Sequence, residues 1–457
     1  MHRAVVDRLL FPMQEWLKGK PTFAMLRELE KTQWLDAAAL HELQFRALRR
    51  HLEFAYREVP YYTRLLDEHE LQPHRIQSFA DFTRIPYLTR DDLRRCFTEL
   101  RPRRRLRGVQ AMSTGGSTGS PVTVLVDRER AAVTDAIRLR CHRWYDAGPG
   151  TREIALWGSP IESNKQDRVR TLRDHLINSK FLSAFDLGEA TLARYAQVVR
   201  QYRPQKLFGY ASALALLAGY LRREGWRPEP GQVRAVFATA EPLYDFQRAL
   251  IGSVFGCPVS VEYGCRDAAL MATECPSGGL HIPVEAVTVE ILPTPGDPDR
   301  DRGEIVVTNT HSYAMPIIRY RTGDIGAFEP TACGCGRALP RLKSVEGRRT
   351  DFLVTPGGKV MHALAAIYVL REVPGIRQFQ LIQERLDLLR VTVAPDPGFP
   401  AAAPDQIVAK LERLFDGQIA VELELVPSIP PLPSGKHRYV ISRVADAHFE
   451  ALTTPGA

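Results

Sequence analysis

The sequence lacks any uninterrupted run of about 18 apolar residues, the length that a membrane-spanning helix requires, within its 457 residues. Residues 1–20 also lack the apolar core and small-residue cleavage site of a secretory signal, because charges are scattered through them. These absences predict a cytoplasmic protein without a membrane span.

Cysteine is scarce and unevenly spaced. The seven cysteines are an odd number, which indicates reduced thiols rather than a disulfide framework. Motifs for nucleic-acid binding are also missing, although the formal net charge is +8. Much of that charge lies in local runs such as Arg101–Arg105, which usually form solvated faces. We therefore expect acidic small molecules, and no nucleic acid, as partners.

The chain is long enough for two or more domains, and its 44% hydrophobic and 25% charged content is ordinary for a globular protein. Apolar residues at helical spacing predict a helix from 35 to 59, which Pro60 should end, followed by an extended aromatic segment at 60–62. A short helix should begin at Thr89, which can cap it, and run to Cys96.

Strands and helices alternate through the middle of the chain. Predicted helices at 131–145, 191–202 and 213–224 alternate with predicted strands at 153–157, 206–208, 233–239 and 259–263. This rhythm favours an α/β fold with a mostly parallel sheet flanked by helices. Ligands of such sheets bind at the carboxyl ends of the strands. Residues 352–457 predict a smaller, separate α+β domain.

A glycine-rich stretch from Met112 to Pro121 precedes the predicted strand 122–126. Glycines let the backbone approach a ligand, and hydroxyl groups suit phosphate oxygens, so the stretch is a candidate triphosphate clamp. No lysine follows Gly119, which excludes a Walker loop. A plain hairpin loop is the alternative. The candidate nucleotide-binding residues here are Thr114, Gly116, Ser117, Thr118 and Gly119.

Polar residues follow several predicted strands. Ala240, Glu241 and Pro242 follow one strand, Arg266 and Asp267 follow the next, and Asp324 ends a third segment that begins at 316. Each carboxylate could instead cap a helix or form a surface ion pair. The aromatic residues Trp157 and Tyr210, near two other strand ends, could line a substrate pocket or belong to the core.

Four further residues have the composition of a structural Cys3His zinc site. Cys275 and His281 are separated by five residues, and Cys333 and Cys335 flank a glycine. This is not a standard finger spacing, and buried reduced cysteines beside a surface histidine are the alternative. Four protein ligands would leave no open position for a substrate.

In chain order, these motifs resemble the adenylate-forming superfamily of acyl-CoA ligases, and within it the phenylacetate-CoA ligase branch with its capsule-biosynthesis relatives. The matching segments are Thr114–Pro121, Ala240–Pro242, Tyr263–Gly264, Tyr320–Asp324, Gly347–Arg348 and Ser434–Lys436. Some members of that branch also carry zinc ligands of the kind described above.

The resemblance implies a nucleotide- and carboxylate-binding domain at 1–346, a hinge at 347–351 and a mobile lid domain at 352–457. It implies that Lys436 is the catalytic cation bridging the carboxylate and the α-phosphate, and that Asp324 holds the ribose. Arg266 could contact a phosphate or the substrate carboxylate, and Asp267 should hold Mg²⁺. The remaining implied nucleotide-binding residues are Ala240, Glu241, Pro242, Tyr263, Gly264 and Arg348.

The sequence departs from the family pattern at several positions. Gly115 replaces a usual serine, Ser120 a frequent lysine, Arg266 a common threonine, Asp267 a glutamate and Thr350 a charged hinge residue. The Lys436 segment is intact, which argues against an inactive enzyme.

The expected function is ATP-dependent activation of an aryl or small acyl carboxylic acid to an acyl-adenylate, followed by transfer to coenzyme A. One alternative is transfer to an amine or a carrier protein, and another is a non-catalytic nucleotide-binding homologue. The expected cofactors are ATP, Mg²⁺ and structural Zn²⁺, with coenzyme A as co-substrate. The N-terminal helices could pack on a second copy in a homodimer or on the large domain.

Overall fold

The structure is a computed structural model that describes residues 1–113, 122–157, 174, 176–184, 187, 189–293, 301–348, 352–357, 360–430 and 438–444. The chain divides into two compact units. The first unit comprises Met1–Leu292, Asp301–Thr322 and Gly326–Val345, and the second comprises Pro293–Arg300, Gly323–Ile325 and Glu346–Ala457.

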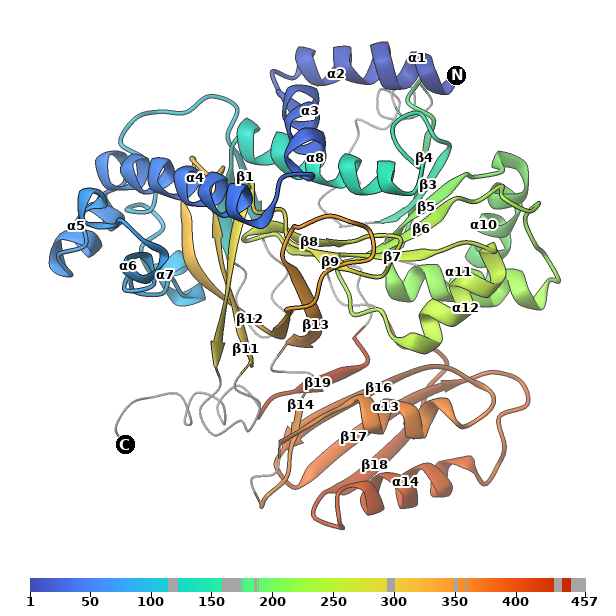
Figure 1. The fold of residues 1–457 in the computed structure, drawn as a ribbon. Coiled ribbons are helices and arrows are strands. Elements are labelled where there is room, and N and C mark those ends of the chain that lie inside the picture. Colours follow the sequence, from blue (N-terminus) through green and yellow to red (C-terminus); the bar gives the residue numbers. More distant parts are fainter. Residues whose placement is uncertain are drawn as a thin grey trace. The chain divides into compact units, whose positions relative to one another are not determined.

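The large unit begins with helices, whose arrangement is shown in Figure 1. They are α1 (Arg3–Val5), the π-helical turn η1 (Val6–Leu10), α2 (Phe11–Leu17), α3 (Thr22–Thr32), α4 (Ala37–Glu58), α5 (Pro60–Glu68), the 3₁₀ turn η2 (Pro73–Arg75), α6 (Phe79–Phe82) and α7 (Arg90–Arg95). The predicted long helix and the cap at Thr89 are confirmed, and Asp92 completes a capping box with that threonine.

The prediction of an extended segment after Pro60 is wrong. Residues 60–62 form the first turn of α5, and Pro60 occupies its first helical position. Proline is favoured there because its fixed φ suits a helix and its missing N–H would have had no partner within the helix. Tyr61 and Tyr62 are therefore buried on a helix rather than on an extended strand.

An 11-stranded sheet forms the body of the large unit, in the order β10-β11-β12-β13-β9-β8-β7-β6-β5-β3-β4. Its strands are β3 (Glu153–Trp157), β4 (Ser179–Ser183), β5 (Lys206–Tyr210), β6 (Ala235–Thr239), β7 (Val259–Cys265), β8 (Ala269–Glu274), β9 (Leu280–His281), β10 (Val287–Pro293), β11 (Arg302–Asn309), β12 (Ile317–Glu329) and β13 (Arg341–Arg348).

The sheet is parallel on one side only. Strands β4, β3, β5, β6 and β7 pair in parallel, as the alternation of strands and helices predicts. The helices that connect or cover them are α8 (Arg128–Trp144), α10 (Glu189–Tyr202), α11 (Ala211–Arg223) and α12 (Asp245–Phe255). Beyond β7 the pairing is antiparallel: β7 pairs with β8, β8 with β9, and β9 with β13. The expected α/β class is confirmed, with a mixed sheet.

A separate hairpin flanks the glycine-rich stretch. Strands β1 (Gln110–Ser113) and β2 (Thr123–Val126) pair antiparallel, and Ala111 lies opposite Leu125. The stretch itself, residues 114–121, lies outside the described residues.

The second unit contains a four-stranded sheet in the order β18-β17-β16-β19 and a small hairpin, β14–β15. Buried and partly exposed positions alternate along its two longest strands, which is the pattern of a sheet with one covered face. Helices α13 and α14 pack on each other and on this sheet (Figure 1). The elements are β14 (Phe352–Val354), β15 (Val360–His362), α13 (Leu364–Arg371), β16 (Ile376–Arg385), β17 (Leu388–Pro395), α14 (Ala403–Leu414), β18 (Ala420–Leu425) and β19 (Val440–Ser442).

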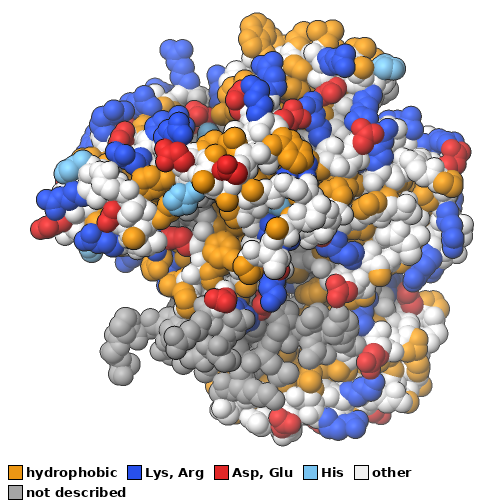
Figure 2. Space-filling model, in the orientation of Figure 1, with side chains coloured by type: hydrophobic (Ala, Val, Ile, Leu, Met, Phe, Trp, Pro, Cys, Tyr) orange, Lys and Arg blue, Asp and Glu red, His pale blue; other side chains and the backbone are white. Residues whose placement is uncertain are grey.

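None of the helices in the described part of the chain is long and apolar enough to cross a membrane. All seven cysteines are free thiols in the structure. Acidic and basic side chains are interspersed over most of the face drawn in Figure 2, and basic side chains project above α4.

Candidate active site

The carboxyl ends of adjacent parallel strands form one edge of the large sheet. The strand register pairs Tyr210 of β5 with Thr239 of β6, and Thr239 with Glu262 of β7. The candidate segments Ala240–Pro242 and Tyr263–Gly264 follow these last two positions directly. The structure therefore brings these two segments to one edge, where ligands of α/β sheets bind.

The two aromatic pocket candidates lie at the same edge. The rings of Trp157 and Tyr210 are 4.5 Å apart between centroids. Tyr210 is almost completely buried within the core formed by β3, β5, β6 and their helices, and Trp157 is half-buried against it. Their role in a substrate pocket remains a prediction.

Glu241 makes a contact of the kind expected for a helix cap. Its carboxylate accepts a hydrogen bond of 2.8 Å from the backbone N–H of Ser212 in the first turn of α11. Ala240, just before it, has a positive φ of 66°, which is uncommon for a residue with a side chain. This turn fixes the backbone that follows β6, and contact of these residues with a nucleotide stays a prediction.

A close approach of two strands shapes the turn after β7. A Cβ atom at Gly264 would lie 2.6 Å from the backbone oxygen of Ala269, so only glycine fits there without a shift of the backbone. Beyond it, the carbonyl of Arg266 accepts a hydrogen bond of 2.6 Å from the buried guanidinium of Arg130. Arg130 therefore holds the turn that presents Asp267.

Asp267 is buried, and only one of its two carboxylate oxygens has a hydrogen-bond partner among the described residues. Its Oδ2 accepts a hydrogen bond of 2.7 Å from the hydroxyl of Tyr320 on β12. Its Oδ1 is also buried and has no hydrogen-bond partner among the described residues. Burial, and then the neighbouring carboxylate, raise the pKa of the Tyr320 hydroxyl well above its ordinary value, so Tyr320 remains a donor.

A buried carboxylate oxygen without a partner is costly unless something binds it. Mg²⁺ binds one or two carboxylates and keeps several of its waters, so a single oxygen of Asp267 fits such an ion. The residues present are thus compatible with Mg²⁺, and Asp267 would be its protein ligand.

A buried charged network joins α8 to strands β3, β5 and β7. His142 of α8 lies between Glu262 and Lys206, with its Nε2 3.2 Å from the Glu262 carboxylate and its Nδ1 3.2 Å from the Lys206 Nζ. Lys206 also forms an ion pair of 2.8 Å with Glu153. An ammonium group can only donate, so Nδ1 accepts and Nε2 donates, which describes a neutral imidazole.

The electrostatics of the network agree with this assignment. Burial, and then Lys206, lower the pKa of His142 to about 4. Burial alone would raise the pKa of Glu262, but Arg138, 3.0 Å away, and His142 outweigh it and lower that pKa to about 2. The carboxylate of Glu262 is therefore ionised, directly before the Tyr263–Gly264 segment.

Several predicted residues are not described at the level of their side chains. Thr114, Gly116, Ser117, Thr118 and Gly119 lie outside the described residues, as does Lys436, and of Arg348 only the backbone position at the end of β13 is described. Asp324 is buried, but it lies inside the continuous strand β12 rather than at a strand end as predicted. The roles of all these residues stay predictions.

The four zinc candidates converge although they are far apart in the sequence. One ligand atom from each of Cys275, His281, Cys333 and Cys335 lies within 4.8 Å of the others. The sulfurs of Cys275 and Cys333 are 3.6 Å apart, and Cys335 Sγ is 3.2 Å from His281 Nε2. The expected surface position for the histidine in the alternative interpretation is wrong, because His281 is buried.

The orientation of His281 suits metal binding. Its Nδ1 lies 3.0 Å from the carbonyl oxygen of Leu339. A proton on Nδ1 would leave the lone pair of Nε2 directed at the thiols, which is how metal-binding histidines are usually held. Gly279 is required beside the cluster, because a Cβ there would lie 2.7 Å from Cys333 Sγ. Three thiols and one imidazole in this arrangement fit a closed tetrahedral Zn²⁺ site.

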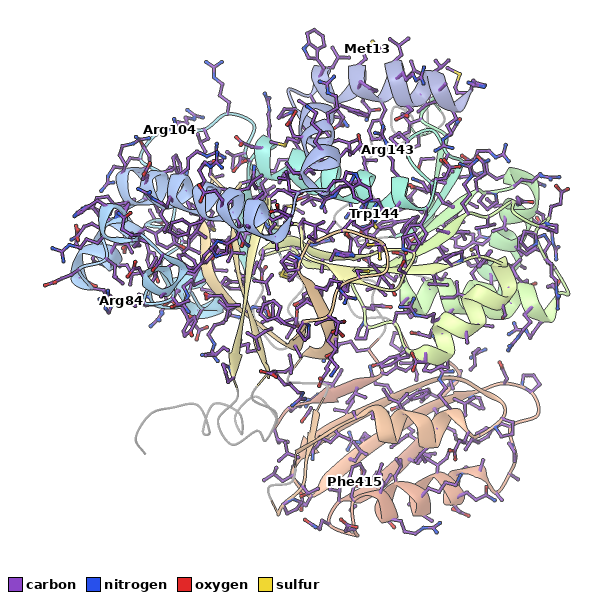
Figure 3. The ribbon with its side chains drawn as sticks, viewed as in Figure 1. Met13, Arg84, Arg104, Arg143, Trp144 and Phe415 are labelled. Carbon is purple, nitrogen blue, oxygen red and sulfur yellow. The ribbon has the colours of Figure 1, made fainter. Side chains whose placement is uncertain are left out.

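The N-terminal helices pack against α8 of the large unit. Arg143, labelled with Trp144 in Figure 3, forms ion pairs of 2.8 Å with Asp7 and 2.6 Å with Glu30. The Trp144 indole donates to Gln33, 2.8 Å away. These contacts place the helices against α8 of the same chain, which is one of the two expected arrangements.

Sequence reasoning missed the residues that support the site. Tyr320 contacts Asp267 across 53 positions of sequence, and His142 contacts Glu262 across 120. Nothing local distinguishes Arg130 or Arg138 from other helix-surface arginines. Tyr320 belongs to the segment Tyr320–Asp324 that resembles a family motif, but nothing in that segment indicates its contact with Asp267.

Comparison with known proteins finds relatives along most of the chain and a family model for its C-terminal part. Residues 353–443 match the family model of the CapK C-terminal domain. The chain is 23% identical to Protein CapK of Staphylococcus aureus over 89% of this chain and 90% of that protein. It is 26% identical to phenylacetate-coenzyme A ligase of Thermus thermophilus over 77% of this chain and 80% of that protein.

The fold is that of a solved adenylate-forming ligase. A crystal structure of 2-hydroxyisobutyryl-CoA ligase in the postadenylation state with 2-HIB-AMP superposes with a TM-score of 0.71 at 20% identity, covering 92% of this chain and 94% of the other. The resemblance noted in the sequence is therefore confirmed, and so is the fold class.

Proposed function

We propose that this chain, a homologue of CapK and the phenylacetate-CoA ligases with the fold of adenylate-forming CoA ligases, is an AMP-forming acid-CoA ligase. It activates a carboxylic acid with ATP, releases pyrophosphate and transfers the acyl group to coenzyme A. The expected cytoplasmic location remains a prediction.

The observation that carries the proposal is the half-satisfied Asp267 at the carboxyl edge of the sheet. The turn of Arg266 and Asp267 is held by hydrogen bonds from Arg130 and Tyr320, while one carboxylate oxygen of Asp267 is left for a ligand. Such preorganisation of a buried anion suits a site that must hold a metal-bound polyphosphate.

The reaction requires positioning and charge neutralisation rather than covalent catalysis. A carboxylate has oxide as its leaving group, so the acid must first be joined to AMP. We assign Mg²⁺ at Asp267 to the phosphates, Asp324 to the ribose, and Lys436 to the cation between carboxylate and α-phosphate. Rotation of the 352–457 unit about 347–351 would then expose the acyl-adenylate to the thiol.

The substrate remains open between aryl and small acyl acids, and the acceptor between coenzyme A and an amine or carrier protein. Transfer to an amine or a carrier protein is the alternative, and a non-catalytic nucleotide-binding homologue is the third hypothesis.

Pyrophosphate release from MgATP across a panel of aryl and small acyl acids, with and without coenzyme A, tests the proposal. We expect release that depends on one acid, rises with coenzyme A and is lost in Lys436→Ala. Release that ignores coenzyme A would favour the amine or carrier acceptor. Nucleotide binding without release for any acid would favour the non-catalytic homologue.

We also propose that Cys275, His281, Cys333 and Cys335 hold a structural Zn²⁺. Atomic absorption should find about one zinc per chain, and Cys335→Ser should lower both the zinc content and the melting temperature. Cys257→Ser, which removes a half-buried thiol outside the cluster, is the matched control. A metal-free protein with the melting temperature of the wild type would contradict this assignment.

A further inference from the structure

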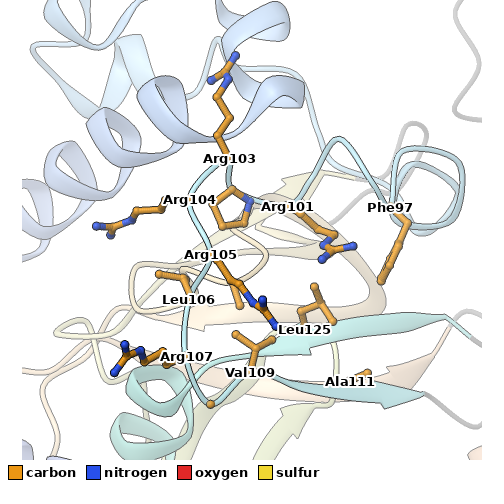
Figure 4. A pocket seen from close by; sticks show the side chains of 13 residues that line it. Phe97, Arg101, Arg103, Arg104, Arg105, Leu106, Arg107, Val109, Ala111 and Leu125 are labelled. Carbon is orange, nitrogen blue, oxygen red and sulfur yellow. The ribbon is translucent and has the colours of Figure 1, made fainter.

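A basic cavity lies on the large unit beside the hairpin β1–β2. Its volume is about 1180 Å³, and the 13 residues that line it include five arginines between 101 and 107 and no acidic residue. Phe97 and Leu125 contribute apolar wall opposite the arginine-bearing segment (Figure 4). The cavity thus combines concentrated positive charge with a non-polar surface.

Two of the five arginines hold the segment in place. The guanidinium of Arg103 donates to the backbone oxygen of Arg57, 2.9 Å away, and its backbone N–H donates to the carbonyl of Glu58 at 2.7 Å. The guanidinium of Arg104 lies 5.0 Å from the centre of the Phe54 ring. These contacts tie the segment to α4 and account for two of the charges.

Arg101 and Arg105 have no such structural role. Both are exposed, and no carboxylate in the described part of the chain pairs with either. Figure 4 shows their side chains on the same side of the segment as Phe97 and Leu125, whereas Arg107 points away. Two guanidinium groups that line one cavity and have no carboxylate partner among the described residues indicate an anionic ligand.

The position of the cavity connects it with the proposed reaction. Its wall includes Ala111 and Leu125, which are cross-strand partners in the hairpin that flanks residues 114–121. Ligand bound there would contact the hairpin. No residue that lines the cavity belongs to β5, β6 or β7, so the cavity is distinct from the edge that these strands form.

We propose that this cavity binds the phosphate groups of a nucleotide, and, resting on the proposed function, that the nucleotide is the phosphorylated adenosine end of the coenzyme A acceptor. Guanidinium groups bind phosphate oxygens in bidentate fashion. The Phe97 ring offers a flat apolar surface on which a base can stack. An uncharged acceptor could not form ion pairs with Arg101 or Arg105.

Calorimetric titration with adenosine 3′,5′-bisphosphate tests the cavity without requiring turnover. We compare the wild type with Arg101→Ser/Arg105→Ser, and with Arg222→Ser/Arg227→Ser as a control that removes the same charge from exposed positions outside the cavity. Two charge-assisted contacts at an exposed site should make the difference about tenfold in affinity, and high salt should reduce it. Equal binding by all three proteins would overturn the proposal.

Steady-state kinetics with coenzyme A and with pantetheine, which lacks the nucleotide, test the identity of the ligand. The Arg101/Arg105 variant should raise the KM for coenzyme A about tenfold while the KM for pantetheine and acid-dependent pyrophosphate release stay at wild-type values. A variant that instead loses pyrophosphate release at limiting ATP would show that these arginines bind ATP, and would overturn the assignment.

The two proposals fail in different ways. A wild type that releases no pyrophosphate with any acid contradicts the proposed function. Even then, weaker bisphosphate binding by the Arg101/Arg105 variant would support the assignment of the cavity as a phosphate-binding site. A wild type that uses coenzyme A and pantetheine with the same KM contradicts the cavity assignment and leaves the ligase intact. Unchanged melting temperatures confirm that the variants are folded.

Discussion

Replacing His142 by glutamine should make the protein less sensitive to acid. His142 is neutral in the folded protein, because Lys206 donates to Nδ1 and Nε2 donates to Glu262, each at 3.2 Å. A glutamine can reproduce this pattern, since its oxygen can accept from the lysine and its NH₂ group can donate to the carboxylate. Unlike histidine, glutamine takes up no proton on unfolding.

The size and sign of the effect follow from proton linkage. The pKa of His142 falls from its ordinary 6.5 to about 4 on folding. As the pH falls below 6.5, the unfolded chain binds a proton that the folded chain refuses until the pH approaches 4. Stability that is fully present above pH 6.5 is therefore lost between pH 6.5 and 4. For these two values, the loss from pH 7 to pH 5 is about 2 kcal/mol.

Urea unfolding followed by tryptophan fluorescence at pH 7 and pH 5 measures this quantity. We expect the free energy of unfolding to fall by about 2 kcal/mol less in His142→Gln than in the wild type. The other histidines whose pKa is lowered by burial, His51 to about 3 and His281 and His311 each to about 4, act equally in both proteins.

His69→Gln is the control, because the ring of His69 is exposed and meets water in both the folded and unfolded states. Its pH dependence should match that of the wild type. If His142→Gln loses as much stability between pH 7 and pH 5 as the wild type, then His142 is not held neutral and the hydrogen-bond assignment is wrong.

Two further substitutions test the turn that presents Asp267. Tyr320→Phe removes the donor to Asp267 and leaves a second buried carboxylate oxygen unpaired. We therefore expect a higher KM for MgATP in pyrophosphate release and a loss of about 1 to 3 kcal/mol in the free energy of unfolding. An unchanged KM would contradict a role for this pair in ATP binding. Gly264→Ala should destabilise by about 1 to 3 kcal/mol in urea unfolding, because its Cβ would meet Ala269. Gly219→Ala, whose nearest neighbouring atom would be 4.0 Å away, should be neutral or stabilising.

The sequence predicted the parallel half of the sheet well, because strands and helices alternate there with clear periodicity. It predicted less of the antiparallel half, where short strands such as β9 (Leu280–His281) follow each other without helices. Pro60 was misread because the same residue that ends one helix also begins the next. Local pattern does not distinguish these two roles.

For the site, the rule that ligands bind at strand ends selected Asp267, and composition selected the four zinc candidates. Their convergence, however, depends on pairing of β9 with β13, which sets the Cys333–Cys335 segment beside His281. Long-range contacts of this kind, like that of Tyr320 with Asp267, leave no periodic trace in a single sequence.

The packing around Arg337 provides an optical signal for the thiol cluster. The Arg337 guanidinium lies 4.6 Å from the ring of Trp34 and 4.4 Å from that of Trp144, and it follows Cys335 by two residues. A cation over an indole ring perturbs its emission, so any change at the cluster that moves Arg337 should alter tryptophan fluorescence. Loading of a metal could thus be followed in the unmodified protein, without a label or a coupled enzyme.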